Sequence, residues 1–490
     1  MHKLSTRSIS TNVAISLINT LVSMIFPLIT YPYVSRVLQV DEIGSINFGS
    51  SIVEYFGVLA AFGISGFAIR NGAAIRNDSV RLQEFVSQMF SINVFTTLIS
   101  FVLLLITLFF TPFLEDYRTI ILIQSLTLIV SPLTLEWLYS IYEDFLYIAV
   151  RNLIVKIFCL IAIFIFVRNR NDVCLYVFIT SMSTVIVSAI NYIHSRKYLC
   201  VKFTFKNEWS IYKSSLVVFF INSIASTIYL NSDKTMLGIF CNDQSVGLYT
   251  TATNIYMIVK RIVAAGVMVI IPRLSFYFQN DKDNFISLVE QGLKVVIFIT
   301  FPMAAGLIVL APETVYIISG TGYENAKDPL IVLAVAIIFA SIANLFSNGV
   351  LISQKKEKMV MRCTIVSSAV NILFNFFMIP LFNETGAAVT TLIAEIIMAI
   401  MSMYYSKIRL LNKQTIMTLC KTIISTVLML TLCLCISHCC KEMNLYLRTA
   451  FVVGTGIIAY FITALIVKEE ILVIYMDKIK QKVLNKANGQ

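Results

Sequence analysis

The sequence predicts an all-α integral membrane protein with about 14 transmembrane helices. Of the 490 residues, 58% are hydrophobic and only 13% are charged, a balance outside the range of water-soluble domains. The mean hydropathy is +0.83. Apolar runs of about 20 residues recur along the chain, and this is the length that a helix needs to cross ~30 Å of hydrocarbon.

The apolar runs give the positions of the expected helices. In chain order they are 12–36, 43–66, 86–110, 118–140, 146–167, 173–194, 214–238, 246–271, 292–311, 329–353, 360–381, 386–406, 415–437 and 446–467. The first run is interpreted as a retained helix, because no A-x-A cleavage pattern follows it. Pro27, Pro32, Pro132 and Pro302 lie inside expected helices and predict bends, since proline removes a backbone hydrogen bond.

The basic residues predict the orientation of these helices. The 38 Lys and Arg outnumber the 27 Asp and Glu and give a net charge of +11. With a cytoplasmic N-terminus, 26 basic residues fall in loops on the cytoplasmic side and seven in the opposite loops, which is the positive-inside pattern. An even number of spans places both termini in the cytoplasm. The net charge therefore reflects membrane topology, and we expect no nucleic-acid partner.

Five cations remain at membrane depth: Arg151, Lys156, Lys234, Lys260 and Arg261. A charge in hydrocarbon costs several kcal/mol unless it is paired, hydrated or bound to a ligand, so all five are candidate binding residues. Lys260 and Arg261 form the best pair, because adjacent helical residues point ~100° apart and at least one should face a polar cavity. For Arg151, which lies nearer the interface than Lys156, snorkelling is the simpler explanation.

Other charged residues have supporting roles in this interpretation. Arg36 and Arg70, near the ends of the first two helices, are expected to be interface anchors or gate residues. The acidic residues near membrane depth are candidates for ion coupling or for counter-charges to the cations, and pairing is the commoner outcome. They are Glu54, Glu136, Asp233 and Glu395.

Cysteine-rich positions at the outer end of the thirteenth expected helix suggest a metal site only weakly. At this end of the apolar helix lie Cys433, Cys435, His438, Cys439 and Cys440, and a free thiol in such a helix behaves as a small hydrophobic group. Zinc sites instead draw on spaced pairs in compact loops. We therefore predict no metal ligands.

A faint internal duplication predicts the domain organisation. A shift of 203 residues places Asn19 on Asn222 and the loop 40–44 on 243–247. Six helices in each half make the halves parallel repeats, which predicts two six-helix lobes around a central cavity. The expected lobes are 1–207 and 208–410, followed by two additional helices and a basic cytoplasmic tail in 411–490.

The sequence favours a transporter over an enzyme. It contains no G-x-x-x-x-G-K-[ST], H-E-x-x-H or G-x-S-x-G motif. The longest hydrophilic stretches, 195–213 and 273–291, are too short to form a catalytic domain. A membrane-embedded glycan transferase or polymerase stays as a third alternative.

Nine short segments, in their order and spacing, resemble the Wzx-type polysaccharide flippases of the multidrug/oligosaccharidyl-lipid/polysaccharide exporter superfamily. They are FPL at 26–28, VDEIG at 40–44, DKTMLG at 233–238, VGLY at 246–249, IPRLS at 271–275, FPMAAG at 301–306, APE at 311–313, IPLF at 379–382 and GAA at 386–388. The resemblance covers residues 10–406.

The resemblance implies a flippase for an undecaprenyl-diphosphate-linked oligosaccharide repeat unit of an O-antigen, capsule or exopolysaccharide. It implies movement from the cytoplasmic to the periplasmic leaflet of the bacterial inner membrane by alternating access. Such a cargo is anionic and cannot cross hydrocarbon unaided, and Lys and Arg would bind its phosphates. No cofactor is expected, and a proton or sodium gradient is the candidate energy source.

The implied partners are the lipid-linked oligosaccharide, membrane phospholipids, and the polysaccharide polymerase with its chain-length machinery. Two alternatives are close to the flippase. A drug/cation antiporter of the same superfamily would need a cavity dominated by acids, whereas cations outnumber acids here. A flippase for a lipid-linked peptidoglycan precursor differs in substrate alone.

Overall fold

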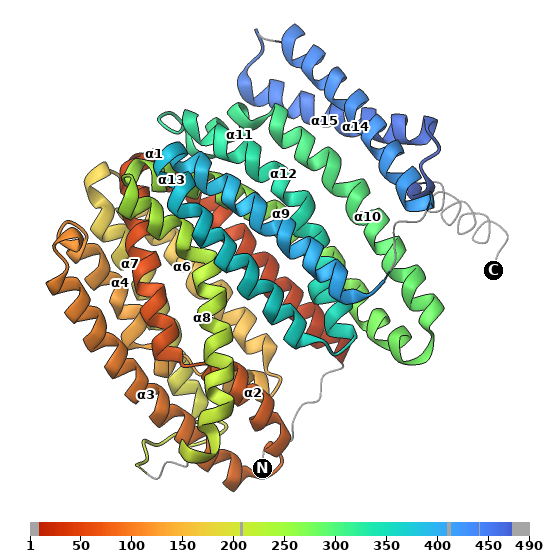
Figure 1. The fold of residues 1–490 in the computed structure, drawn as a ribbon. Helices are drawn as coiled ribbons and strands as arrows, with labels where there is room; N and C mark the ends of the chain where they lie inside the picture. The colour runs from red at the N-terminus through yellow and green to blue at the C-terminus, as the bar shows by residue number, and fades with distance from the viewer. Residues whose placement is uncertain (1–8, 206–208, 409–412, 441, 473–490) are drawn as a thin grey trace. The chain divides into compact units, whose positions relative to one another are not determined.

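The computed structural model describes residues 9–205, 209–408, 413–440 and 442–472, and every regular element in these ranges is helical (Figure 1). The basic tail residues Lys478, Lys480, Lys482 and Lys486 lie outside them. The α-helices are α1 (Ile9–Ala61), α2 (Ile64–Ile75), α3 (Ser79–Phe110), α4 (Arg118–Ile129), α5 (Glu136–Ile141), α6 (Phe145–Phe166), α7 (Val173–Ser195), α8 (Trp209–Phe240), α9 (Asp243–Asn280), α10 (Lys282–Val309), α11 (Ala311–Ser319), α12 (Lys327–Asn344), α13 (Glu357–Ser406), α14 (Lys413–Cys439) and α15 (Leu445–Ile466).

The helices confirm the predicted fold class. Within the described ranges, 12 helical stretches are long and apolar enough to cross a membrane. Two of them contain two predicted helices each, and non-helical backbone at Gln39 (φ 71°) in α1 and Asn383 (φ 49°) in α13 separates these helices in the gaps predicted between 36 and 43 and between 381 and 386. The remaining ten each cover one predicted helix. The predicted helix 118–140 is interrupted by a 3₁₀ turn (Ser131–Leu133) containing Pro132, so this proline does break the helix.

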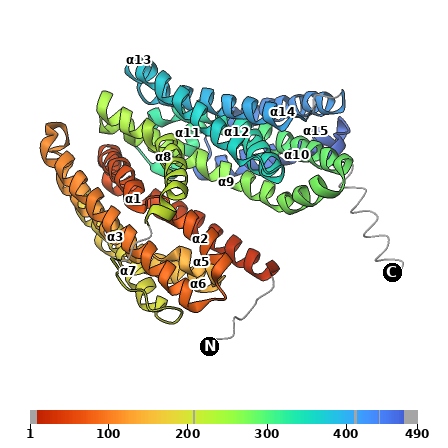
Figure 2. The same cartoon turned by 60° about the horizontal axis from the view of Figure 1, so that its bottom comes forward.

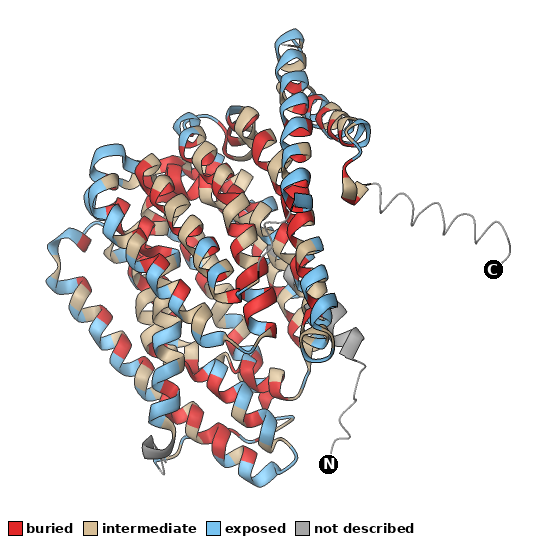
Figure 3. Cartoon of the chain, turned by 45° about the vertical axis from the view of Figure 1, so that its right-hand side comes forward, coloured by how far each residue is buried: buried red, intermediate tan, exposed pale blue. Residues whose placement is uncertain are grey.

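The surface of the helices is apolar and their buried faces are partly polar, as α14 shows. Its buried positions include the hydroxyl residues Thr415, Thr418, Thr422, Ser425 and Thr426. Its exposed positions include the large apolar residues Ile423, Ile424, Val427 and Leu428. Figure 3 shows buried and exposed residues alternating along the helices. Small polar side chains between helices with apolar side chains outside are typical of membrane helices. The protein is therefore a multi-pass membrane protein.

The chain forms two compact units, 1–247 and 248–490. In the first unit α1 is central and packs against α3, α4, α6 and α8, while α4 and α6 also pack against α7. In the second unit α12 packs against α10 and α13, and α14 and α15 lie together beside α10 (Figure 2). These units are defined by packing, and the predicted lobes 1–207 and 208–410 stay a prediction.

Two glycines bring the kinked region of α1 against the start of α9 within the first unit. A Cβ atom on Gly44 would lie 1.8 Å from the Asp243 carbonyl oxygen, and one on Gly247 would lie 2.2 Å from the Val40 carbonyl oxygen. Only glycine permits such close approach of two backbones. The predicted shift of 203 residues maps Val40 onto Asp243 and Gly44 onto Gly247. The contact therefore has the reciprocal form expected of a repeat, although the repeat itself stays a prediction.

Candidate functional site

Arg151 on α6 lies in a buried hydrogen-bonding network. It is 4% exposed, and its Nη2 atom donates to Glu136 Oε1 at 2.5 Å and to Asn152 Oδ1 at 2.8 Å. Its Nη1 atom donates to Asn191 Oδ1 on α7. The expectation that Arg151 snorkels is therefore wrong, because an ion pair with Glu136 on α5 already compensates its charge inside the unit.

Asn191, like Asn152, belongs to this network but was not predicted from the sequence. It accepts from Arg151, and its own Nδ2 donates to the Thr134 carbonyl in the break between α4 and α5. The Tyr139 hydroxyl donates to the Asn191 carbonyl. The available signal was that Asn191 is the single carboxamide side chain in α7.

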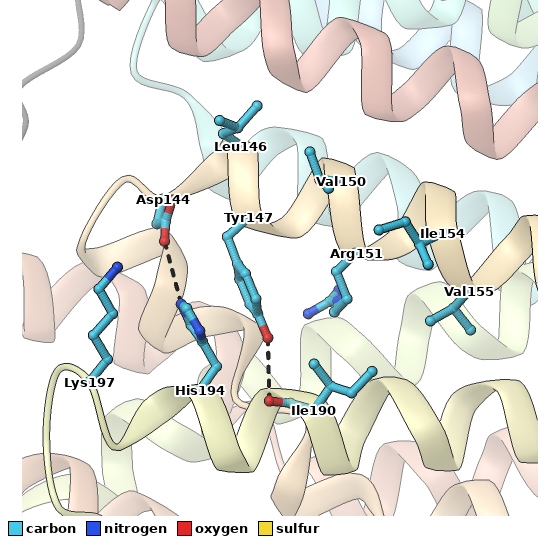
Figure 4. A pocket seen from close by; sticks show the side chains of 10 residues that line it. All are labelled: Asp144, Leu146, Tyr147, Val150, Arg151, Ile154, Val155, Ile190, His194 and Lys197. Carbon is cyan, nitrogen blue, oxygen red and sulfur yellow. Dashed lines mark hydrogen bonds and ion pairs between the residues drawn. The ribbon is translucent and has the colours of Figure 1, made fainter.

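A pocket of about 470 Å³ lies beside Arg151, on the side of α6 that packs on α7 (Figure 4). At its polar end His194 stacks on Tyr147, with ring centroids 3.8 Å apart and planes inclined by 8°. Asp144 Oδ2 lies 3.8 Å from His194 Nε2 and accepts from the Tyr198 hydroxyl at 2.6 Å. The lining residues are Asp144, Leu146, Tyr147, Val150, Arg151, Ile154, Val155, Ile190, His194 and Lys197.

Lys234 lies in a polar seam between α1 and α8. Its Nζ atom donates to Asn47 Oδ1 at 3.2 Å, and Asn231 one turn earlier donates to Glu54 Oε2 at 2.5 Å. The neighbouring Asp233 is buried. We call this set the α1–α8 seam; its remaining members are Ser51, Tyr55 and Thr235. The predicted residues Lys234, Glu54 and Asp233 are thus brought together.

Lys156 on α6 contacts uncharged groups of α1. Its Nζ atom donates to Ser23 Oγ at 2.9 Å and lies 5.8 Å from the centroid of the Phe26 ring. One turn earlier Asn152 donates to Asn19 Oδ1 at 3.2 Å. Lys156 therefore keeps donors that an anionic ligand could use.

In the second unit Lys260 on α9 forms an ion pair with Glu395 on α13. Glu395 is 3% exposed and also accepts from the Tyr256 hydroxyl at 2.8 Å. The Lys260 ammonium lies 5.3 Å from the centroid of the Tyr256 ring. Arg261, the other half of the predicted pair, is exposed, as expected for adjacent residues that point ~100° apart.

The two candidate gate or anchor residues lie on the surface of the first unit. Arg36 is exposed and its Nη1 atom donates to the Pro32 carbonyl at 2.5 Å on the same helix. Arg70 is exposed on α2. In the described part of the chain, no group of three His, Cys, Asp or Glu is arranged to hold a metal ion.

The fold and these charged clusters define a polytopic α-helical membrane protein with ion pairs at membrane depth. The chain belongs to the polysaccharide biosynthesis protein family, whose model matches residues 9–278. A second family model, for the lipid II flippase MurJ, matches residues 234–454.

Related sequences carry consistent names. A putative O-antigen transporter of Escherichia coli (strain K12) is 23% identical over 398 residues, which cover 79% of this chain and 94% of the relative. A probable low-salt glycan biosynthesis flippase of Haloferax volcanii is 25% identical over 203 residues, covering 41% of this chain and 43% of the relative. These names agree with the prediction of a transporter and not an enzyme.

Solved structures share the fold. The lipid II flippase MurJ in an inward closed conformation superposes with a TM-score of 0.74 at 18% identity, covering 95% of this chain and all of that one. An outward-facing transporter of the multidrug resistance MATE family superposes with a TM-score of 0.55 at 13% identity, covering 81% of this chain and 96% of that one. An inward-facing MATE transporter gives 0.57 at 14% identity, covering 78% of this chain and 94% of that one.

Proposed function

We propose that the protein is a flippase that moves an undecaprenyl-diphosphate-linked oligosaccharide repeat unit from the cytoplasmic to the periplasmic leaflet of a bacterial inner membrane. The observation that carries this proposal is the match, over 79% of this chain and 94% of the relative, to a protein named as a putative O-antigen transporter. The likeness in fold to the lipid II flippase, which extends over the whole of that chain, supports it.

The charged clusters suit an anionic cargo. A lipid diphosphate needs cations that can exchange their present partners for phosphate oxygens. Lys156 and Lys234 donate to the neutral side chains of Ser23 and Asn47, so phosphate is the stronger acceptor for both. Lys260 and Arg151 already pair with carboxylates and would bind phosphate only by exchanging them. Exposed Arg261 adds a fifth charge.

Alternating access is the proposed mechanism. Transporters of this fold have been solved in inward-facing and outward-facing conformations, which supports two states for the fold. We propose a proton or sodium gradient as the driving force, with Glu395, Glu136 and Glu54 as coupling groups, and the polymerase with its chain-length machinery as partners.

A drug/cation antiporter is the second candidate, favoured by the likeness to MATE transporters. That likeness covers less of this chain than the likeness to the lipid II flippase does. The charge pattern also opposes it, because a cationic drug would have to bind beside lysine and arginine.

Deletion of the gene in its host separates the two candidates. A flippase predicts loss of surface polysaccharide and accumulation of lipid-linked units on the cytoplasmic leaflet, restored by the gene on a plasmid. Intact surface polysaccharide together with altered drug sensitivity would contradict the proposal and favour the antiporter.

A further inference from the structure

The pocket between α6 and α7 changes from polar to apolar along the helix axes. Asp144 directly precedes α6 and Lys197 lies just beyond the end of α7, so both lie at one end of the pocket (Figure 4). Val150, Ile154 and Ile190 form its wall toward the other end and are exposed on the outside of the unit. A side chain ten residues along a helix is ~15 Å farther on, so the pocket has the length of a lipid headgroup and the first part of an acyl chain.

The polar end sits where a headgroup would lie. The loop between α5 and α6 and the segment after α7 are both predicted to be cytoplasmic from the distribution of basic residues. Tyr147 and His194 border this end and present aromatic faces together with polar atoms. Amphipathic aromatic side chains favour this level of a membrane.

One nitrogen group at this end has hydrogen-bonding capacity to spare. Lys197 is exposed, and among the described residues its ammonium forms no ion pair and lies 5.7 Å from the centroid of the Tyr198 ring. A phosphodiester could accept a hydrogen bond from this ammonium.

The charges that line the pocket decide the type of headgroup. Glu136 compensates Arg151, so the lining leaves one uncompensated cation, Lys197, and one carboxylate, Asp144. A headgroup with one negative and one positive charge matches this pair. A headgroup with only a negative charge would bring its phosphate close to Asp144 without a compensating amine.

We propose that this pocket binds one phospholipid with a zwitterionic amine headgroup, its phosphodiester at Lys197 and its ammonium at Asp144. One acyl chain lies along Val150, Ile154 and Ile190. The site belongs to the first unit alone and does not depend on which cargo the protein moves.

Lipid retention tests the site directly. The full-length protein in mild detergent is given equal amounts of phosphatidylethanolamine and phosphatidylglycerol, and bound lipids are counted by native mass spectrometry. We expect one phosphatidylethanolamine to be retained in preference to phosphatidylglycerol. Lys197→Gln should lower that retention roughly tenfold, since a hydrogen bond to a charged group is lost. Arg196→Gln removes an adjacent exposed charge that does not line the pocket and should change nothing.

Two further pairs of variants test the two ends of the site. Asp144→Asn should reduce the preference for the amine headgroup, whereas Glu143→Gln should not, because Glu143 does not line the pocket. Ile154→Trp should block the chain and lower retention, whereas Ile157→Trp, at an equally exposed position outside the pocket, should not. Glycerophosphoethanolamine, which lacks acyl chains, should not compete.

Several results would overturn the proposal. Equal retention by the Lys197→Gln variant and the unchanged protein would show that Lys197 does not bind the phosphodiester. Preference for phosphatidylglycerol would contradict the zwitterionic class, and competition by glycerophosphoethanolamine would indicate a site for a soluble phosphate ester. Equal effects of Ile154→Trp and Ile157→Trp would show that no chain lies in the groove.

Discussion

Lys260 and Glu395 are the clearest ion pair at membrane depth, because the carboxylate is buried and accepts from both Lys260 and Tyr256. Removing one partner leaves the other charge without compensation, whereas removing both removes the desolvation cost as well. We therefore expect Lys260→Met or Glu395→Leu alone to lower the free energy of unfolding by about 2–3 kcal/mol, and the double variant to lose less than either. Thermal unfolding in detergent measures this cycle. Additive losses would show that the two side chains do not interact.

Lys156 is the cation whose charge the substrate should need most. Lys156→Gln should reduce polysaccharide export at least about tenfold, since a charge-assisted bond to phosphate is lost, while leaving the amount of protein in the membrane unchanged. Lys156→Arg should retain most export because it keeps the charge. Lys213→Gln, an exposed position on α8, is the matched control for loss of a lysine. Normal export by the Lys156→Gln variant would remove this residue from the site.

At the residue scale, the sequence predicted which charged residues need compensation more reliably than it predicted the residues that compensate them. Membrane depth singled out Arg151, Lys234 and Lys260 as residues needing compensation. Their partners could not be assigned, because the contact of Arg151 with Asn191 depends on how α6 packs on α7, and local sequence does not encode this packing. Arg151 was misjudged for the same reason.

Gly44 and Gly247 hold two elements of the first unit in backbone contact. Gly44→Ala should destabilise the protein strongly, because its Cβ would lie 1.8 Å from the Asp243 carbonyl and only backbone movement relieves the overlap. Gly57→Ala on the same helix has nothing within 4 Å of its Cβ and should be tolerated or slightly stabilising. The yield and melting temperature of the folded protein compare the two. A tolerated Gly44→Ala would show that the contact between α1 and α9 is looser than described.

Asp281 begins α10 by accepting from the Asn284 backbone amide at 3.0 Å. This hydrogen bond, together with one from the Asn284 side chain, lowers the pKa of the Asp281 carboxyl below its usual value. The cap therefore stabilises the fold above the ordinary aspartate pKa of about 4, and its contribution is lost as the pH falls through the lowered pKa.

Asp281→Asn keeps an amide oxygen that can cap the helix but removes the titration. We expect melting temperatures measured between about pH 3 and pH 6 to fall less steeply for this variant than for the unchanged protein. Parallel curves would show that the Asp281 carboxylate does not contribute to the acid sensitivity of the fold.

The helices themselves were predictable from sequence, because an apolar run of sufficient length has few alternatives in a membrane. Every predicted span lies on a helix, and Pro132 marks the break between α4 and α5. The predicted breaks between 36 and 43 and between 381 and 386 are confirmed, because Gln39 and Asn383 have non-helical backbone there. Neither residue is proline or glycine, so the exact position of each break was not predictable from the local sequence.

At the scale of the whole molecule, the distribution of charge and the order of short motifs carried the family prediction, which the match to the polysaccharide biosynthesis protein family confirms. The amino-acid composition alone was sufficient to predict a membrane protein. The cargo was not predictable in detail, because the candidate charged residues are scattered over α1, α6, α8, α9 and α13 and form no local motif.

The central claim is that this chain moves a lipid-linked oligosaccharide between leaflets, and the sidedness of that lipid tests it most directly. Right-side-out vesicles are prepared from cells that lack the gene and from the same cells carrying it, and an impermeant probe that modifies the oligosaccharide is added outside. We predict that the lipid-linked oligosaccharide is modified only when the protein is present, and that Lys156→Gln reduces the modified fraction. Equal modification with and without the protein would contradict the account.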